Sequence, residues 1–549
     1  MKYCTCIAAC LIAFASFSQA PTKIEEEISF PKKPKLVIGI VVDQMRYDYI
    51  YRFWDKYGNN GFKRLVNEGF FCKNTNFNYV PTYTGPGHAS IFTGTTPAIH
   101  GIIANDWFDK ENLKKLYCVG DINVNGLGTN ESEGKRSPVN MLTTTITDEL
   151  RISSNMKSKV FGVALKDRSA ILPAGHVANA AYWYDGSIGS FISSTYYMKE
   201  LPLWVNEFNK KELAKKYLME PWNTLLPIEQ YTESLPDDNK YEFIAKGETK
   251  PVFPHNLPEL LRANGGLNLI RSVPSGNTLT KDFAIEIIKN ENLGKSSETD
   301  FLTISFSSPD YIGHAYGPNS VEQEDDYIRL DNEIADFLNF LDAYIGKNNV
   351  LLFLTADHAA PEVPAYLIDL KIPAGYVNEG KILRNLKTYL FANYADSLVL
   401  SYSNQQVFLN RNLIALKKLD LKKVQEDAAL YLQNLDGIAE VTTSTALNNT
   451  SFNEGSRNLI QKGFNAKRSG DLMVNYLPAW VDFHKTGTTH GSPYSYDTHV
   501  PLIFYGWNIK KGSTADQIYI TDIAATLALM LNIQFPNGSI GVPISHLVK

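Results

Sequence analysis

The stretch "KLVIGIVVD" (35–43) is a continuous apolar run, rich in β-branched residues, that ends in an aspartate. Such a run predicts a strand buried on both faces, as in a parallel sheet. Four more runs of this kind follow: "KVFGVALKDR" (159–168), "DFLTISFSSPD" (300–310), "NVLLFLTAD" (349–357) and "VPLIFYG" (500–506). Helical patterns lie between them, most clearly at 321–345 and 521–533. We therefore expect an α/β fold with a mostly parallel central sheet and helices on both faces.

Two long stretches, at about 185–295 and about 362–480, interrupt this alternation. No Gly/Ser-rich or Pro-rich linker sets either of them apart, so we expect residues 21–549 to form one domain that carries two insertions. The net charge of −5 gives no reason to expect nucleic acid as a partner. No stretch beyond the N-terminal segment is apolar over a length that would span a membrane.

Residues 1–20 have the pattern of a secretory signal peptide. A basic start precedes the apolar run 4–17, and Ser18-Gln19-Ala20 offers small residues for cleavage after Ala20. This pattern predicts export, with the periplasm as the expected location. Lipid attachment at Cys10 stays open, although it would leave little apolar segment before the cysteine. An oxidising compartment permits a disulfide between Cys72 and Cys118, and the sequence does not decide whether they pair.

Charged residues and histidines lie where four of the predicted strands end. They are Asp43, the pair Lys166 and Arg168, Asp310 with His314, and Asp357 with His358. Each alone is commonly a helix cap or a solvated strand end. Together they should meet at one edge, because ligands of open α/β sheets bind outside the carboxyl ends of the strands. Aspartate and histidine without cysteine are typical of a hydrolytic zinc site.

A further histidine is needed for a second metal ion, and the segment before the last strand offers three. His490 lies in the turn "TGTTHGSP", where backbone can approach an ion, so we select it over His484 and His499.

The stretch "YVPTYTGPGHASIFTG" (79–94) places Thr84 in front of Gly-Pro-Gly. Proline is favoured in the first turn of a helix, so a helix should begin just after Thr84. A helix N-terminus is also a natural anion site. Thr84 is therefore either a helix cap or a nucleophile, and the two interpretations are compatible in geometry.

Taken together, these residues resemble the alkaline phosphatase superfamily. The matching pieces are Asp43, Thr84 in "TYTGPGHAS", Asp310-x-x-x-His314, Asp357-His358, and His490 before "THVPLIFYG". The resemblance implies two zinc ions per chain, one held by Asp310, His314 and His490, the other by Asp43, Asp357, His358 and the Thr84 oxygen. It also implies that Thr84 is the nucleophile and forms a covalent phosphothreonine. Gly85 follows the nucleophile and no magnesium cluster is evident, so we expect no third Mg²⁺ site.

Within that superfamily the chain resembles a flavobacterial group of phosphate monoesterases. The resemblance rests on Asn105 in "GIIANDWF" and on Lys166 and Arg168 in "ALKDRSA". It implies that these three residues hold the phosphoryl oxygens. We therefore expect an exported, monomeric, zinc-dependent alkaline phosphatase acting on small-molecule phosphate monoesters.

Other functions stay open at this stage. A phosphodiesterase of the nucleotide pyrophosphatase type would share the zinc ligands, the threonine and an asparagine, but not the Lys/Arg pair. A sulfatase is disfavoured because threonine cannot be converted to its catalytic aldehyde. An exported binding protein that keeps the fold without activity is the alternative from another class.

Overall fold

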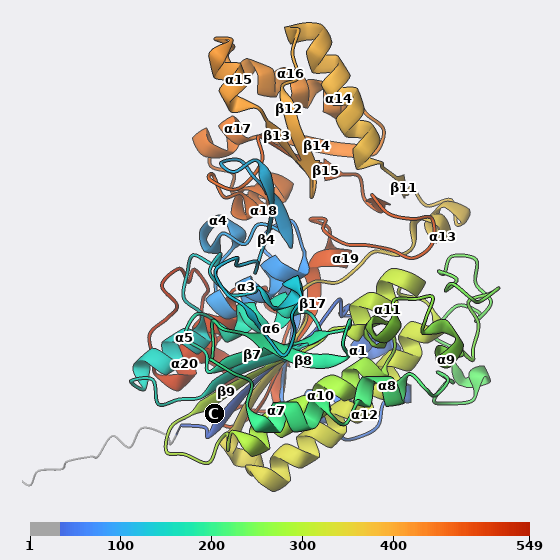
Figure 1. Ribbon diagram of the computed structural model, residues 1–549, viewed down its shortest axis with the longest axis vertical. Coiled ribbons are helices and arrows are strands. Elements are labelled where there is room, and N and C mark those ends of the chain that lie inside the picture. Colours follow the sequence, from blue (N-terminus) through green and yellow to red (C-terminus); the bar gives the residue numbers. More distant parts are fainter. Residues whose placement is uncertain (1–32, 549) are drawn as a thin grey trace, which may run out of the picture. The chain divides into compact units, whose positions relative to one another are not determined.

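The computed structural model describes residues 33–548, so the predicted signal peptide lies outside the described residues. Its centre is an eleven-stranded sheet, seen near the middle of Figure 1, in which β19 (Ile518–Tyr519) pairs with β2 (Phe70–Asn76) beside β18 (Gly512–Thr514). The remaining strands follow the order β18, β2, β17 (His499–Gly506), β10 (Val350–Thr355), β1 (Leu36–Val42), β9 (Asp300–Phe306), β6 (Val160–Ala164), β7 (Ala180–Asp185), β8 (Ser190–Ser194) and β5 (Gly126–Leu127).

The five strands at the centre of the sheet are parallel, which confirms the predicted fold class. Ile38 of β1 lies opposite Leu352 of β10 on one side and Leu302 of β9 on the other. Every residue of β1 is buried, because both faces of the sheet are covered. This double burial explains why the strand is a continuous apolar run without alternation.

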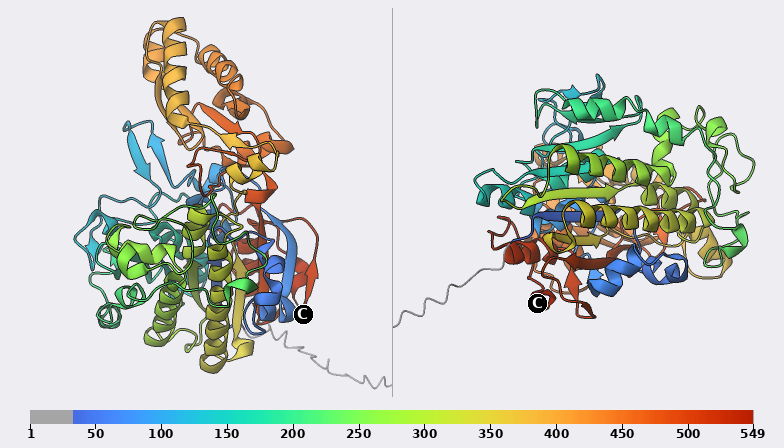
Figure 2. Two further views of the ribbon diagram at one scale, coloured as in Figure 1. Left: turned by 90° about the vertical axis from the view of Figure 1, so that its right-hand side faces the viewer. Right: turned by 90° about the horizontal axis from the view of Figure 1, so that it is seen from below.

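Helices cover both faces of this sheet (Figure 2). On one face α3 (Thr84–Thr93) packs against α6 (Asp167–Ala174) and α20 (Asp522–Leu531). On the other face α10 (Ser275–Asn290) packs against β9 and against α12 (Val321–Tyr344). The helical patterns at 321–345 and 521–533 match α12 and α20 closely.

One predicted strand direction is wrong. The run 500–506 forms β17, which is antiparallel both to β10 and to β2. A strand buried on both faces has the same apolar pattern whichever way it runs, so periodicity alone could not give its direction.

The stretch 362–480 contains a separate four-stranded sheet in the order β12 (Val399–Ser403), β13 (Gln406–Leu409), β15 (Leu472–Tyr476) and β14 (Ile438–Thr443). Helices α14 (Glu379–Tyr394) and α16 (Leu421–Gln433) pack on it and share its apolar core, in orange at the top of Figure 1. Short strands β11 (Gly375–Tyr376) and β16 (Trp480–Val481) pair at its base. We call residues 375–481 the upper segment.

The stretch 185–295 is mostly helix and loop. It contains α7 (Leu203–Asn209), α8 (Leu213–Tyr217), α9 (Leu257–Leu260) and α10, and α10 belongs to the layer that covers the sheet. Cys72 and Cys118 are buried and free, so they do not form a disulfide. Between residues 33 and 548 no helix is long and apolar enough to cross a membrane.

Candidate active site

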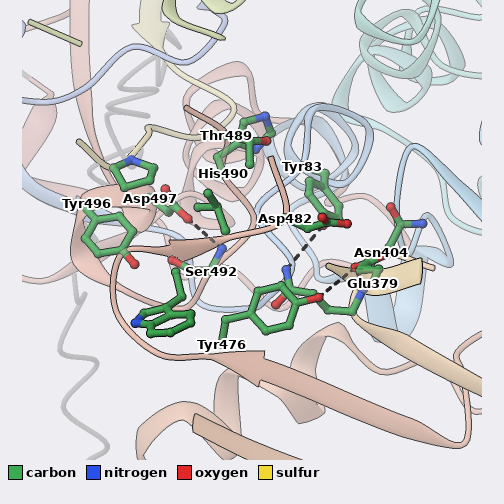
Figure 3. Close-up of a pocket in the computed structure, with 14 residues that line it drawn as sticks. Tyr83, Glu379, Asn404, Tyr476, Asp482, Thr489, His490, Ser492, Tyr496 and Asp497 are labelled. Carbon is green, nitrogen blue, oxygen red and sulfur yellow. Dashed lines mark hydrogen bonds between the residues drawn. The ribbon is translucent and has the colours of Figure 1, made fainter. Parts of the chain in front are cut away.

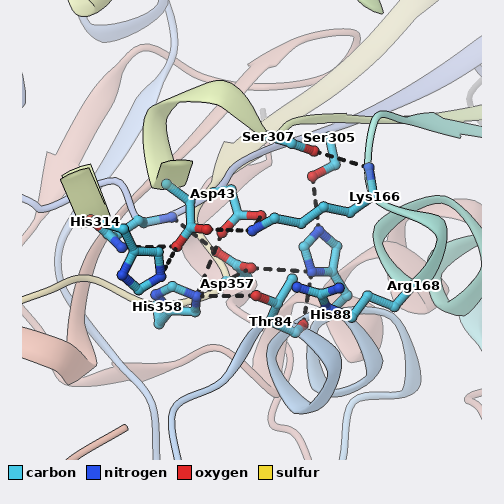
Figure 4. Close-up of polar contacts among 12 residues, drawn as sticks. Asp43, Thr84, His88, Lys166, Arg168, Ser305, Ser307, His314, Asp357 and His358 are labelled. Atoms are coloured by element: carbon cyan, nitrogen blue, oxygen red, sulfur yellow. Dashed lines mark hydrogen bonds and ion pairs between the residues drawn. The ribbon is translucent and has the colours of Figure 1, made fainter. Parts of the chain in front are cut away.

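The carboxyl ends of β1, β6, β9 and β10 bring the predicted residues together at one edge of the sheet (Figure 4). Asp43 directly follows β1, and Lys166 is the residue before the first turn of α6, just after β6. Asp310 lies in the first turn of α11 (Ser308–Tyr316), after β9, and Asp357 follows β10. The parallel register explains this convergence, because parallel strands all end on the same side.

One group of possible metal ligands consists of Asp310, His314 and His490. Asp310 and His314 lie one turn apart on α11 and so share a face of that helix. His314 Nε2 lies 3.2 Å from Asp310 Oδ1, and His490 Nε2 lies 3.6 Å from the same oxygen.

The tautomers of these two histidines follow from their other ring nitrogens. Nδ1 of His314 lies 2.7 Å from the carbonyl oxygen of Thr488, and Nδ1 of His490 lies 2.6 Å from that of Thr82. A carbonyl only accepts, so each Nδ1 carries a proton. In the neutral rings each Nε2 then presents a lone pair to the Asp310 carboxylate, an arrangement that a cation between them satisfies.

A second group consists of Asp43, Asp310 and His358, so Asp310 belongs to both groups. His358 Nε2 lies 3.5 Å from Asp43 Oδ1 and 3.6 Å from Asp357 Oδ2. These two carboxylate oxygens are buried and accept no hydrogen bond. A buried charged oxygen without a partner is costly, so this donor set fits a bound cation. Asp and His ligands without cysteine fit zinc.

The electrostatics of the site show an excess of negative charge. Burial raises the pKa of Asp357 to about 7, and burial together with the neighbouring Asp310 raises that of Asp43. Burial would also raise the pKa of Asp310, but in the metal-free site Lys166 and the protonated form of His314 hold it well below its usual range. The Lys166 ammonium and one imidazolium against three buried aspartates still leave room for further positive charge.

Lys166 is the cation at the centre of this cluster. Its Nζ lies 2.6 Å from Asp43 Oδ2 and 2.5 Å from Asp310 Oδ2, with the side chain almost fully buried. Burial alone would lower the pKa of Lys166, but the two carboxylates raise it above its ordinary value. The lysine therefore stays charged at neutral pH.

Thr84 is buried at the start of α3, one residue earlier than predicted. Its Oγ1 lies 3.5 Å from His358 Nε2. The backbone N–H of Gly85 donates to Asn105 Oδ1 over 2.7 Å, so Asn105 is fixed beside the helix start. A Cβ at Gly87 would lie 2.2 Å from the carbonyl oxygen of Asp357, so only glycine allows this helix to approach the end of β10.

Arg168 lies on α6 with part of its donor capacity unused. Its Nη1 contacts the hydroxyl of Tyr117 at 3.2 Å, while its buried Nε has no hydrogen-bond partner. Lys166 and Arg168 line one pocket of about 270 Å³ together with Arg136 and Arg271. We call this the basic pocket.

Two residues of the site escaped the sequence analysis. His88 Nδ1 lies 2.9 Å from the carbonyl oxygen of Thr84 and 3.3 Å from Asp357 Oδ2, and burial lowers its pKa to about 4. Because His88 comes four residues after Thr84 on a predicted helix, the sequence could have indicated that the two side chains lie on the same face. Gln44 donates its backbone N–H to Asp357 and its side-chain amide to Asp310, and no pattern in the sequence marks it.

Comparison with known proteins identifies the family. The type I phosphodiesterase / nucleotide pyrophosphatase family matches residues 37–499. A protein of Myroides odoratus named calcium-transporting ATPase is 46% identical, with 100% of both chains covered. The alkaline phosphatase PhoV of Synechococcus elongatus is 45% identical over 100% of this chain and 99% of its own.

The third relative is the alkaline phosphatase PafA of Elizabethkingia meningoseptica, 44% identical over 94% of this chain and 95% of its own. A crystal structure of wild-type PafA matches with a TM-score of 0.91 at 43% identity, covering 95% of this chain and 100% of that one. A second PafA structure carries replacements of a threonine, an asparagine, a lysine and an arginine. Two of these three relatives are named alkaline phosphatases. The chain belongs to the type I phosphodiesterase / nucleotide pyrophosphatase family of the alkaline phosphatase superfamily, and it is an enzyme similar over nearly its whole length to two alkaline phosphatases.

Proposed function

We propose that this chain is a zinc-dependent alkaline phosphatase that hydrolyses small-molecule phosphate monoesters through a phosphothreonine at Thr84. One observation carries the proposal: two neighbouring clusters of Asp and His side chains, one around Asp310 and one around His358, lie beside a buried threonine at a helix N-terminus. Asp310, His314 and His490 would hold one zinc ion, and Asp43, Asp357 and His358, with the Thr84 oxygen, the other. Zinc bound there would supply positive charge for the attacking and leaving oxygens.

Thr84 Oγ1 gives up its proton and forms a bond to phosphorus, while the bond from phosphorus to the leaving oxygen breaks and that oxygen takes up a proton to depart as the alcohol. Water then adds to the phosphothreonine, and the Thr84 oxygen leaves with a proton. Thr84 is well placed for attack because it begins α3, whose N-terminal N–H groups and dipole favour a phosphoryl group. Its backbone carbonyl accepts from His88, which fixes the first turn of the helix.

The charges beside Thr84 favour a monoester. A monoester dianion has three non-bridging oxygens, and Lys166 and Arg168 offer two permanent cations to neutralise them. The buried Nε of Arg168 is an unused donor, which suits a two-point contact with phosphate. A diester has one charged oxygen fewer and would gain less from this pair. The four residue types replaced in the PafA mutant are those of Thr84, Asn105, Lys166 and Arg168.

The second candidate is a phosphodiesterase, which the name of the matching family favours. The test compares kcat/KM for phenyl phosphate and for methyl phenyl phosphate. We expect the monoester to be preferred, and Arg168→Ala to slow the monoester by about 10²–10³-fold while changing the diester little. A wild-type preference for the diester, or equal losses on both substrates, would overturn the monoesterase assignment.

Metal content and export are tested separately. Metal analysis of the protein dialysed against zinc should give two zinc ions per chain, with no third site that retains magnesium. Expression of the full chain in a Gram-negative host should yield mature periplasmic protein that begins after Ala20 and elutes as a monomer. Cleavage elsewhere, or lipid at Cys10, would contradict the proposed processing.

A further inference from the structure

A second pocket, of about 190 Å³, opens beside His490 (Figure 3). Tyr83, which precedes Thr84, and His490, which belongs to the Asp310 group, form part of its wall, so the pocket adjoins the reacting site. Much of the remaining wall comes from the upper segment: Glu379, Asn404, Gln405, Tyr476 and Trp480. We call it the aromatic pocket.

We propose that the aromatic pocket is the subsite for the leaving group, and that it selects a neutral, hydroxylated leaving group about the size of one sugar ring. This inference rests on the proposed phosphatase function and names the substrate class for it. It also gives the upper segment a role, because that segment supplies one side of the pocket.

The position of the pocket agrees with an in-line displacement. The leaving oxygen departs on the side opposite the attacking one, and Thr84 Oγ1 lies beside His358. His490 stacks on His358, with ring centroids 3.4 Å apart. The aromatic pocket lies beside His490, and the ring of Tyr83, which also lines the pocket, packs edge to face against the His490 ring. A leaving group that departs toward the Asp310 group therefore enters this pocket.

The walls suit a ring with apolar faces and polar edges. Tyr83, Tyr476, Trp480 and Tyr496 line the pocket, and such side chains combine a broad apolar face with a polar tip. The volume is below the ~300–1,000 Å³ of sites for drug-sized ligands, so a single ring fits better than a nucleoside.

Two carboxylates of the pocket have an oxygen that accepts no hydrogen bond from the protein. Tyr476 Oη–H and the N–H of Gln405 both donate to Glu379 Oε1, which leaves Oε2 as an acceptor for a ligand. Asp497, only 1% exposed, accepts two backbone N–H groups through Oδ2, while its buried Oδ1 has no hydrogen-bond partner. These two free acceptor oxygens favour a ligand that brings hydroxyl groups.

The charge of the pocket is opposite to that of the basic pocket. Glu379, Asp482 and Asp497 line it, and its described lining residues include no lysine or arginine. Arg136 and Arg271, by contrast, belong to the basic pocket. A leaving group with a carboxylate or a second phosphate would meet carboxylates in the aromatic pocket, so the site should discriminate against it.

The test uses three monoesters: methyl phosphate, whose leaving group is too small to fill the pocket, glucose 6-phosphate, and the carboxylate-bearing 6-phosphogluconate. Wild-type kcat/KM should be at least tenfold higher for glucose 6-phosphate than for 6-phosphogluconate. Trp480→Ala should lower kcat/KM for glucose 6-phosphate about tenfold and leave methyl phosphate within about twofold. Asp482→Lys, at an exposed position, should reduce the difference in kcat/KM between glucose 6-phosphate and 6-phosphogluconate.

Trp54→Ala is the control, because Trp54 lines a different pocket. It should leave the ratios of kcat/KM among the three substrates unchanged. Unchanged ratios in both Trp480→Ala and Asp482→Lys would overturn the inference. So would a wild-type preference for 6-phosphogluconate, which would place the leaving group beside Arg136 and Arg271.

Binding of free glucose, followed by saturation-transfer NMR, tests the pocket without turnover. The signal should be present in the wild type and lost in Trp480→Ala, and an unchanged signal would contradict the inference. A wild type that binds glucose but hydrolyses neither methyl phosphate nor phenyl phosphate would instead disprove the proposed function.

Discussion

Replacing Lys166 by methionine should make the stability of this protein depend on metal. The ammonium contacts Asp43 and Asp310 at 2.6 and 2.5 Å, and all three side chains are buried. Methionine keeps most of the apolar stem but leaves two buried carboxylates without their cation. Breaking a buried ion pair costs about 3–5 kcal/mol. A typical domain has only about 5–15 kcal/mol of unfolding free energy, so the metal-free variant should be severely destabilised.

The assay is urea unfolding of wild type and Lys166→Met, each with EDTA and with excess zinc. We expect the free energy of unfolding of Lys166→Met to be about 3–5 kcal/mol below that of the wild type in EDTA. In zinc the deficit should fall below about 1 kcal/mol, because a divalent cation compensates the charge of the same carboxylates. Lys281→Met is the matched control: Lys281 is 8% exposed and pairs with Glu333 at 2.7 Å. Its deficit should be the same in both conditions. An equal loss for Lys166→Met in EDTA and in zinc would refute the view that its partners are metal ligands.

Three further predictions concern single side chains. Thr84→Ala should lower turnover of phenyl phosphate by about 10⁴–10⁶-fold with zinc content unchanged, and normal turnover would remove the nucleophile assignment. In the metal-free protein, burial raises the pKa of Asp357 to about 7, so its folded state holds the proton more tightly than the unfolded state does. The resulting contribution to the free energy of unfolding, about 4 kcal/mol, is complete below pH 4 and is lost as the pH rises to 7. Urea unfolding measured from pH 4 to 8 should show this loss in the wild type and not in Asp357→Asn. His88→Gln should weaken zinc affinity or turnover about 10–100-fold, whereas His100→Gln, at a buried histidine bonded to Ser90, should not.

Much of the fold could be predicted because the central strands are simple. β1, β6, β9 and β10 are buried on both faces, so their apolar runs are continuous, and their polar ends mark where a parallel sheet opens to a ligand. The direction of β17 could not be read, because direction depends on the connection from the upper segment and not on the strand itself. In the upper segment the sequence indicates short strands and the helix that is α16, but not that the strands pair into a sheet of their own, since short strands carry weak patterns.

For the site, the sequence identified which residues meet, but not how they contact one another. The Lys166 ammonium lies on Asp43 and Asp310, a contact that depends on the spacing of three strands. Gln44 adopts a positive φ of 64°, which lets it reach both Asp357 and Asp310. Such a conformation in a residue other than glycine has no sequence signature.

His490 is the last of the predicted ligands to be synthesised, since it follows the whole upper segment and comes shortly before β17. A ribosome that has completed the strands β1, β6, β9 and β10 has therefore made an edge crowded with carboxylates but not the imidazole that completes the Asp310 group. Truncated products that stop before His490 should lack a complete site, and they would also lack β17, which joins β10 to β2. The Asp310 group thus depends on a residue that is synthesised only after the whole upper segment, so a product truncated within that segment should not bind a metal ion at this group.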